Sequence, residues 1–471
     1  MQKLGAFLFC LQLSLAGAGA QSLLLRPDPD RGGALPEMDV SVNRGNEAET
    51  AVAVNHKNPL QVTTVSNLEA DALFHSWSID GGKSWQHNLI ANGDSLGFAC
   101  CDAQLASDDF GNIFLTYLSS DIAIKMAIST DGGATFQSLP FLTSLPTGLP
   151  VMPWKSLAAV GQAISGDQPS IATGPSSVWI SWTSFDGTIQ ASGAAVTGLG
   201  QVGAFTPAQG IPGAVREGDY GDTAVGPDGQ VFITFQNPTG GEGPSTVYGA
   251  FDPDGLGPTG VGPAQVIETT NVGGFDYIPA QSGRSIDAEA GLAWDRTGGA
   301  HNGRLYHIFV SEEPNESNNT DINLRYSDDN GATWSTPVRV NDDLGTTSQF
   351  NPKLALDGTT GKIAVAWYDA RNDAGDNGRG DTNGVPNDDV MIYSAVSRDG
   401  AMTFQPNVRL SLAPSNDNGA RSGVDYGDYS GFAYYKGRLF FSAADNSNAT
   451  GTNPDGTLKA FDLVITPLNL R

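Results

Sequence analysis

The chain has 471 residues, including 59 Gly and 27 Pro, and only 16% of its residues are charged. Its formal net charge at pH 7 is −26. A surface this acidic repels polyanions, which argues against nucleic acids and anionic lipid surfaces as partners.

Residues 1–20 predict a signal peptide that is cut before Gln21. Lys3 is followed by a mostly apolar run over residues 4–16 and then by small residues. That order is typical of a secretory signal, and the run is too short to span a bilayer as a helix. We therefore expect a secreted, extracellular protein without a membrane span. Residues 21–37 would form an N-terminal linker, and residues 38–471 a single domain.

The rest of the chain has the pattern of an all-β fold. Short β-branched and aromatic runs, such as Val231–Phe235 and Ile363–Tyr368, are separated by clusters of Gly, Asp and Asn. No long stretch shows the 3.6-residue periodicity of a helix. Such runs are typical of many short antiparallel strands joined by tight turns.

A short motif, here called the turn motif, recurs four times. Its copies read SIDGGKSW from Ser78, STDGGATF from Ser129, SDDNGATW from Ser327 and SRDGAMTF from Ser397. An aspartate at this spacing can accept backbone N–H bonds in a tight turn, and the glycine permits a positive φ. We therefore predict that the motif aspartates hold hairpins and take no part in catalysis. They are Asp80, Asp131, Asp329 and Asp399.

A longer repeat joins a polar start, a small apolar strand, a turn and a bulky strand. Its seven copies begin at Glu49, Asp102, Asp167, Asp222, Glu289, Asn351 and Asp428. A repeat that forms one antiparallel sheet is typical of a propeller blade. We predict a β-propeller of seven four-stranded blades, with six blades as the alternative. A large β-sandwich would not explain why the longer repeat recurs along the chain.

The four turn motifs resemble the Asp-box, or BNR repeat, of sialidases and related secreted propellers grouped with glycosyl hydrolases. The resemblance implies a sialidase-like, exo-acting glycoside hydrolase that acts on a glycan containing sialic or uronic acid. A polysaccharide lyase on the same fold and a non-catalytic propeller that binds a glycan or a protein are the alternatives. We expect a monomer whose partner is an acidic oligo- or polysaccharide.

In a propeller, the loops that lead into the first strand of each blade meet at one mouth of the central channel. Here these loops carry the carboxylates Glu47, Glu49, Asp102, Asp167, Asp219, Asp222, Asp287, Glu289, Asp425 and Asp428. Crowded carboxylates raise one another's pKa values, and this prepares them for acid and base roles. We predict Asp102 and Glu289 as catalytic carboxylates. In sialidases the nucleophile is a tyrosine near the C-terminus, and the resemblance places that role on Tyr429, which precedes Ser430, or on Tyr426.

Four arginines precede these carboxylates: Arg44, Arg216, Arg284 and Arg421. Guanidinium groups bind carboxylates in a bidentate fork. We predict that Arg216, Arg284 and Arg421 converge on a sugar carboxylate, with Arg44 nearby. The alternative is that each arginine pairs with an acid of its own loop.

Three further features bear on the chemistry. The adjacent Cys100 and Cys101 form either a vicinal disulfide or two buried thiols. Asn-x-Ser/Thr sites at Asn315, Asn318 and Asn448 predict surface loops open to glycosylation. The 369–389 segment holds six aspartates and is either a solvated loop or a calcium site. No other cofactor is expected, and the channel carboxylates are the second place where calcium would bind.

Overall fold

The structure is a computed structural model that describes residues 36–141, 166–213, 218–219, 221–420 and 425–469. Helix in these ranges is confined to the 3₁₀ turn η2 (Asp417–Gly419). No helix in the described part of the chain is long and apolar enough to cross a membrane. The predicted signal peptide lies outside the described residues.

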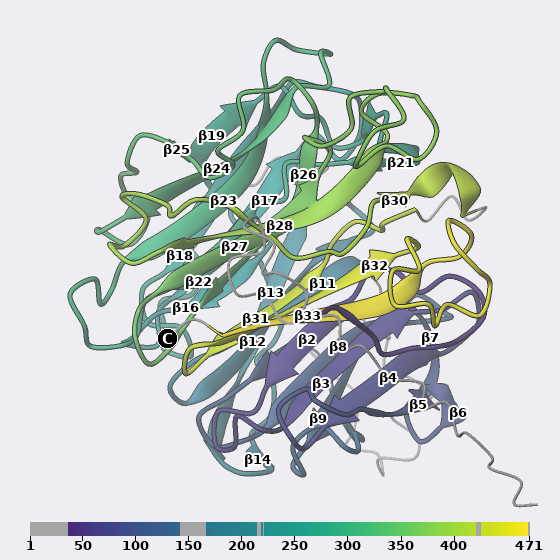
Figure 1. The fold of residues 1–471 in the computed structure, drawn as a ribbon. Helices are drawn as coiled ribbons and strands as arrows, with labels where there is room; N and C mark the ends of the chain where they lie inside the picture. Colours follow the sequence, from purple (N-terminus) through teal and green to yellow (C-terminus); the bar gives the residue numbers. More distant parts are fainter. Residues whose placement is uncertain (1–35, 142–165, 214–217, 220, 421–424, 470–471) are drawn as a thin grey trace, which may run out of the picture.

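Seven antiparallel sheets form the blades of a β-propeller (Figure 1). The first blade has β2 (Ala51–Val54), β3 (Val62–Asn67), β4 (Leu73–Ser78) and β5 (Gln86–Ile90). The second has β6 (Asn92–Asp94), β7 (Gly97–Ser107), β8 (Ile113–Ser119), β9 (Ile124–Ser129) and β10 (Gln137–Leu139). The third has β11 (Gly166–Thr173), β12 (Ser177–Ser184), β13 (Ile189–Gly198), β14 (Gln201–Val202) and β15 (Gln209–Gly210).

The next three blades repeat this order. The fourth has β16 (Thr223–Val225), β17 (Val231–Asn237), β18 (Ser245–Asp252) and β19 (Gln265–Thr270). The fifth has β22 (Gly291–Trp294), β23 (Leu305–Glu312), β24 (Thr320–Ser327) and β25 (Val338–Arg339). The sixth has β26 (Gln349–Leu356), β27 (Ile363–Asp369), β28 (Asp389–Ser397), β29 (Val408–Arg409) and β30 (Ser415–Asn416). A separate hairpin of β20 (Asp276–Ile278) and β21 (Gln281–Ile286) lies between the fourth and fifth blades in sequence.

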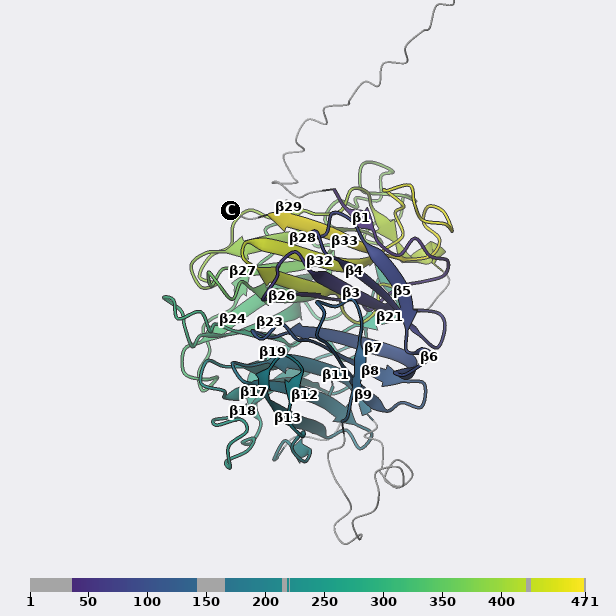
Figure 2. The ribbon, with the colours of Figure 1, turned by 90° about the horizontal axis from the view of Figure 1, so that it is seen from below.

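The seventh blade closes the ring with strands from both ends of the chain. β31 (Gly431–Tyr435), β32 (Arg438–Asp445) and β33 (Asp462–Asn469) are joined by β1 (Met38–Asp39), which pairs with β33 (Figure 2). The register places Met38 opposite Ile465 and Asp39 opposite Val464. The pairing of β1 with β33 joins the two ends of the chain in one blade and so fastens the ring, in which each blade packs against its neighbours. The prediction of seven blades is confirmed.

Alanine occupies one equivalent position in the innermost strand of every blade. The seven residues are Ala53, Ala106, Ala172, Ala224, Ala293, Ala355 and Ala433. Several of them line a cavity of about 290 Å³ in the central channel, together with Ser170 and Lys353. Seven strands converge around this axis, where large side chains would collide, so packing density favours a small residue.

The turn motifs hold the loops between the third and outermost strands. In the first copy, Asp80 Oδ1 accepts the N–H of Ser84 at 3.0 Å and Asp80 Oδ2 accepts its hydroxyl at 2.6 Å. Ser78 Oγ accepts the N–H of Gly82 at 2.8 Å. Equivalent bonds surround the other three motif aspartates. The predicted hairpin-holding geometry is therefore present in all four copies.

Candidate functional site

A cavity of about 530 Å³, here called the mouth cavity, opens where the loop before β2 and the first parts of β7 and β11 meet the β20–β21 hairpin. Its carboxylates are Glu49, Glu69, Asp102, Asp167, Asp219 and Asp428. Arg284, the rings of Phe275 and Tyr277, and the Cys100–Cys101 pair complete the wall. The two rings are 46% and 49% exposed, so they offer flat apolar faces to a ligand.

Unusual backbone conformations accompany this convergence. A residue within or just before each of five innermost strands has a positive φ, although none of the five is glycine. They are Glu49 (51°), Asp102 (58°), Gln168 (45°), Glu289 (47°) and Asn351 (45°). Left-handed conformations are costly for residues with a side chain and tend to gather at functional sites. Because these conformations recur at equivalent positions, we expect functional residues at this end of the channel.

Asp102 and Asp167 form a close carboxyl pair. The N–H of Gln168 lies 3.1 Å from Asp102 Oδ2 and 3.1 Å from Asp167 Oδ1. Burial raises the pKa of Asp102 well above its usual range, and the charges of Glu49 and Asp167 and a hydrogen bond with Asp167 raise it further. The surroundings of Asp102 therefore favour its protonated form, whereas the side chain of Asp167 is exposed at the cavity.

Arg284 links three segments of the mouth. Its Nε donates to Asp428 Oδ1 at 2.6 Å, and its NH2 group donates to the other Asp428 oxygen and to Glu49 Oε1, the latter at 3.1 Å. Burial and the charge of Asp428 raise the pKa of Glu49 to about 7, although Arg284 opposes this shift. The partners of Arg284 are thus acids of other blades, and the alternative of pairing within its own loop is wrong for this arginine.

Tyr429 lies directly behind the mouth cavity. It lines a smaller cavity of about 40 Å³ with Asp222, Glu289 and Lys353. Burial, followed by the charges of Asp102 and other carboxylates, raises the pKa of Tyr429 well above its usual value. The side chain is therefore a neutral phenol at pH 7, unlike an activated nucleophile. Its hydroxyl is buried beside the carboxyl group of Asp102.

Glu289 lies deeper in the channel than the mouth cavity. Its Oε1 is 3.4 Å from Lys353 Nζ, and burial raises its pKa to about 7 against the opposing effect of Lys353. The neighbouring Asp287 also has a pKa raised by burial and by the charge of Glu289. Glu289 therefore lies with Asp222 and Lys353 around the smaller cavity and not with Asp102 in the mouth cavity.

The structure separates several other residues that the sequence predicted together. Tyr426 is 0% exposed and packs against Phe350, Tyr368 and Phe461, so it belongs to the core and not to the cavity wall. Arg44 is exposed and forms an ion pair with Asp455 at 3.3 Å. Arg216 and Arg421 lie outside the described residues, so their convergence on Arg284 stays a prediction. The three Asn-x-Ser/Thr sites lie in surface loops at Asn315, Asn318 and Asn448.

Some features of the mouth were not singled out as site residues from the sequence. Cys100 and Cys101 form a vicinal disulfide, which decides between the two alternatives for this pair. The aromatic residues Phe275 and Tyr277 belong to a hairpin outside the blade repeat. The long connection between the fourth and fifth repeats was the signal that could have revealed this hairpin.

The sequence matches no family model and no curated protein. Among solved structures, it is similar to the GH93 α-L-arabinofuranosidase of Fusarium graminearum in complex with arabinobiose (10% identity, TM-score 0.44, 93% of this chain and 98% of that chain). It is also similar to the Hadza microbial sialidase Hz136 (13%, 0.44, 87% and 74%) and to the BP39L lectin from Burkholderia pseudomallei (14%, 0.47, 85% and 94%). At these identities and scores, the similarities say nothing about the chemistry of the mouth cavity.

Proposed function

We propose that the mouth cavity hydrolyses a glycosidic bond. The observation that carries the proposal is the Asp102–Asp167 pair, in which a buried carboxyl group with a raised pKa lies beside an exposed one. Glycoside hydrolysis requires two such groups in different protonation states. The exposed rings of Phe275 and Tyr277 supply the apolar faces against which sugar rings stack.

The roles of the pair follow from their environments. Asp102 donates its proton to the glycosidic oxygen as the bond to the anomeric carbon breaks. Asp167 serves as the base or as the nucleophile once bound substrate separates the two carboxyl groups, by about 6.5–9.5 Å for an inverting reaction or about 5–5.5 Å for a retaining one. Tyr429 acts as a neutral hydroxyl behind Asp102 and not as a phenolate nucleophile, because its pKa is raised.

The charge of the mouth cavity bears on the substrate. Six carboxyl groups and one arginine line the cavity in the described part of the chain. Arg284 is already bound to Asp428 and Glu49, so less of its positive charge is open to a sugar carboxylate. An uncharged glycan therefore suits this wall better than an acidic one. The acidic glycan expected from the sequence depends on Arg284 together with Arg216 and Arg421.

The test is a screen of neutral, sialylated and uronate-containing oligosaccharides against the purified protein. We expect new reducing ends from a neutral glycan, and Asp102→Asn should lower the rate by about 10²–10⁴-fold, as is typical for loss of a general acid. Asp71→Asn, which changes an exposed carboxylate on the loop between β3 and β4, is the matched control and should keep the wild-type rate.

Other outcomes would contradict parts of this proposal. Release of sialic or uronic acid alone would support the acidic-glycan arm and overturn the argument from charge. An unsaturated uronate product would identify a lyase. Glycan binding without any product, unchanged by Asp102→Asn, would identify a binding propeller and overturn the hydrolase proposal.

A further inference from the structure

The disulfide between Cys100 and Cys101 lies at the boundary between the mouth cavity and the core. Both cysteines line the cavity, and both are half-buried. They also pack against a buried cluster of the second and third blades that includes Leu118 and Trp182. The next residue along the chain is Asp102, which donates the proton in the proposed hydrolysis. The disulfide is therefore directly attached to the residue on which that reaction depends.

The backbone of β7 departs from regular pairing with β8 on both sides of Cys101. The pairs that frame the two register shifts are Ala99–Ser119, Cys101–Leu118 and Gln104–Thr116. Each shift places one more residue on β7 than on β8, as in a β-bulge. The second shift contains Asp102, which has a φ of 58°. Bulges re-aim side chains, and a residue keeps such a φ only where its surroundings hold it.

Hydrogen bonds hold the chain on either side of the disulfide. Before it, the N–H of Ser120 donates to the carbonyl oxygen of Phe98 at 3.0 Å. After it, the N–H of Gln168 in the third blade donates to Asp102 Oδ2 at 3.1 Å. Between these contacts the disulfide closes a small ring through the peptide bond that joins the two cysteines. Because disulfides accept a narrow range of torsion angles, this ring restricts the backbone directly before Asp102.

The disulfide contributes little to the stability of the whole chain. In the chain-entropy model, a disulfide stabilises by restricting the unfolded chain, and more so when the loop that it closes is longer. Cys100 and Cys101 are adjacent, so their loop is the shortest possible. The third cysteine of the chain, Cys10, lies in the predicted signal peptide. A local role at the mouth therefore explains the pair better than a role in holding the blades together.

We propose that the Cys100–Cys101 disulfide is a positioning element that fixes Asp102 in the mouth cavity. The proposal rests on the proposed hydrolysis, in which Asp102 must reach the glycosidic oxygen. While the bond is intact, the backbone before Asp102 is locked and the carboxyl group stays beside Asp167. When the bond is reduced, the two register shifts relax and the carboxyl group loses its fixed place. Rates of catalysis depend steeply on such placement.

A displacement of Asp102 also changes its charged surroundings. The groups that face it come from the loop before β2, from β11, from β21 and from the loop before β31. They are Glu49, Asp167, Arg284, Asp428 and Tyr429. Burial, followed by the charges of the neighbouring carboxylates, raises the pKa of Asp102. A displaced carboxyl group that reaches water should therefore titrate at a lower pH.

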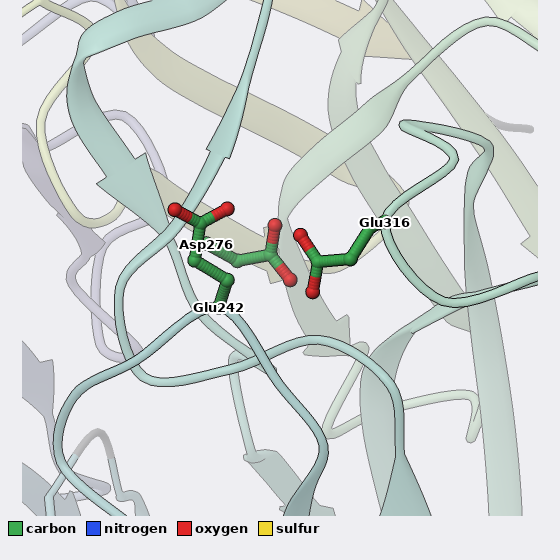
Figure 3. A group of neighbouring side chains, drawn as sticks. All are labelled: Glu242, Asp276 and Glu316. Carbon is green, nitrogen blue, oxygen red and sulfur yellow. The ribbon is translucent and has the colours of Figure 1, made fainter.

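The hairpin on another side of the mouth cavity provides a control. Asp276 of β20 gathers with Glu242 and Glu316 from two loops, and one carboxylate oxygen of each lies within 4.8 Å of the others (Figure 3). None of the three lines the mouth cavity. Proximity of acids alone does not identify an ion, so we assign none to this group. Glu242→Gln changes a charge of this group and leaves the disulfide and Asp102 unaltered.

The test compares the oxidised and reduced forms of the folded protein. The dithiol dithiothreitol supplies two electrons and two protons, so the disulfide becomes two thiols while the reagent closes to its own disulfide. We expect kcat to fall at least about tenfold while KM stays within about twofold, because placement of the acid is lost and sugar stacking is not. Reoxidation with oxidised glutathione should restore kcat. Glu242→Gln should have the wild-type kcat and the same response to the dithiol.

The double variant Cys100→Ser with Cys101→Ser should have the kcat of the reduced protein and should not respond to the dithiol. If this variant does not fold, reduction of the folded wild type, verified by thiol titration, gives the same comparison. Titration of the Asp102 carboxyl group by ¹³C NMR is a readout that needs no substrate, and its midpoint should fall on reduction. Asp131, beyond β9 at the other end of the same blade, should titrate identically in both forms.

These readouts separate the disulfide proposal from the hydrolase proposal. If no glycan is cleaved but reduction lowers the titration midpoint of Asp102, the positioning role is supported and only the hydrolase proposal fails. Unchanged kcat and an unchanged Asp102 titration after reduction would overturn the positioning role. A loss of activity that merely follows unfolding, seen by circular dichroism, would also overturn it, because the disulfide would then be structural.

Discussion

Arg284→Gln is the perturbation that most directly tests how the mouth is held together. The substitution removes the partner of two carboxylates whose side chains are almost fully buried, Glu49 at 3% exposure and Asp428 at 9%. Breaking a buried ion pair by removing one partner costs about 3–5 kcal/mol. The Arg284 side chain is 31% exposed, so solvent screens part of this loss. We therefore expect a destabilisation of about 2–3 kcal/mol at neutral pH.

The loss should depend on pH in a defined direction. Burial raises the pKa of Glu49 from 4.5 to about 7, so protonation of Glu49 stabilises the folded state. This stabilisation is present in full below pH 4.5 and is lost as the pH rises towards 7. Arg284 lowers that pKa, so the variant should have a still higher value. Each further pKa unit adds about 1.4 kcal/mol to the difference in free energy of unfolding between wild type and variant under alkaline conditions.

The assay is urea denaturation of both proteins at about pH 5 and about pH 9, with the free energy of unfolding taken from the linear extrapolation. Arg44→Gln is the matched control, because its ion pair with Asp455 is exposed and such pairs contribute about 0–1 kcal/mol. An Arg284→Gln penalty that is equal at both pH values, or no larger than that of Arg44→Gln, would refute the reasoning.

Two further predictions concern the turn motifs. Gly133→Ala should cost about 2–4 kcal/mol, because Gly133 has a φ of 90° and a new Cβ would lie 2.5 Å from the Cβ of buried Thr63. The control is Gly229→Ala, at a φ of 88° with no atom within 4 Å of the new Cβ, and it should lower the free energy of unfolding by only about 1 kcal/mol. If chemical denaturation shows that the two substitutions lower this free energy equally, the packing argument is wrong. Asp131→Ala should lower stability by about 1–2 kcal/mol through loss of its bonds to Ser129 and Thr135. Its hydrolytic rate per folded molecule should equal that of the wild type, and a stable but inactive variant would show that the motif is more than structural.

The blades could be predicted from the sequence because their determinants are local. In the turn motif, Asp131 binds residues no more than four positions away, so its spacing alone defines the turn. Period-two strands and repeated polar starts then indicate antiparallel sheets, and their number indicates the number of blades. The same reasoning placed Asp102 at a channel mouth, because it stands at an equivalent position of its repeat.

The partners within the site could not be predicted in this way, because they depend on how distant blades meet. Arg284 binds Asp428 and Glu49, which are 144 and 235 residues away in sequence, although Asp287 stands three positions from it. Tyr426 and Tyr429 are equally compatible with a cavity when only the sequence is considered. The backbone between them turns through Gly427 with a φ of 80°, so Tyr426 enters the core and Tyr429 lines a cavity. Local spacing determined the blades and their turns, whereas closure of the ring decided which charges face one another, since only closure sets their distances.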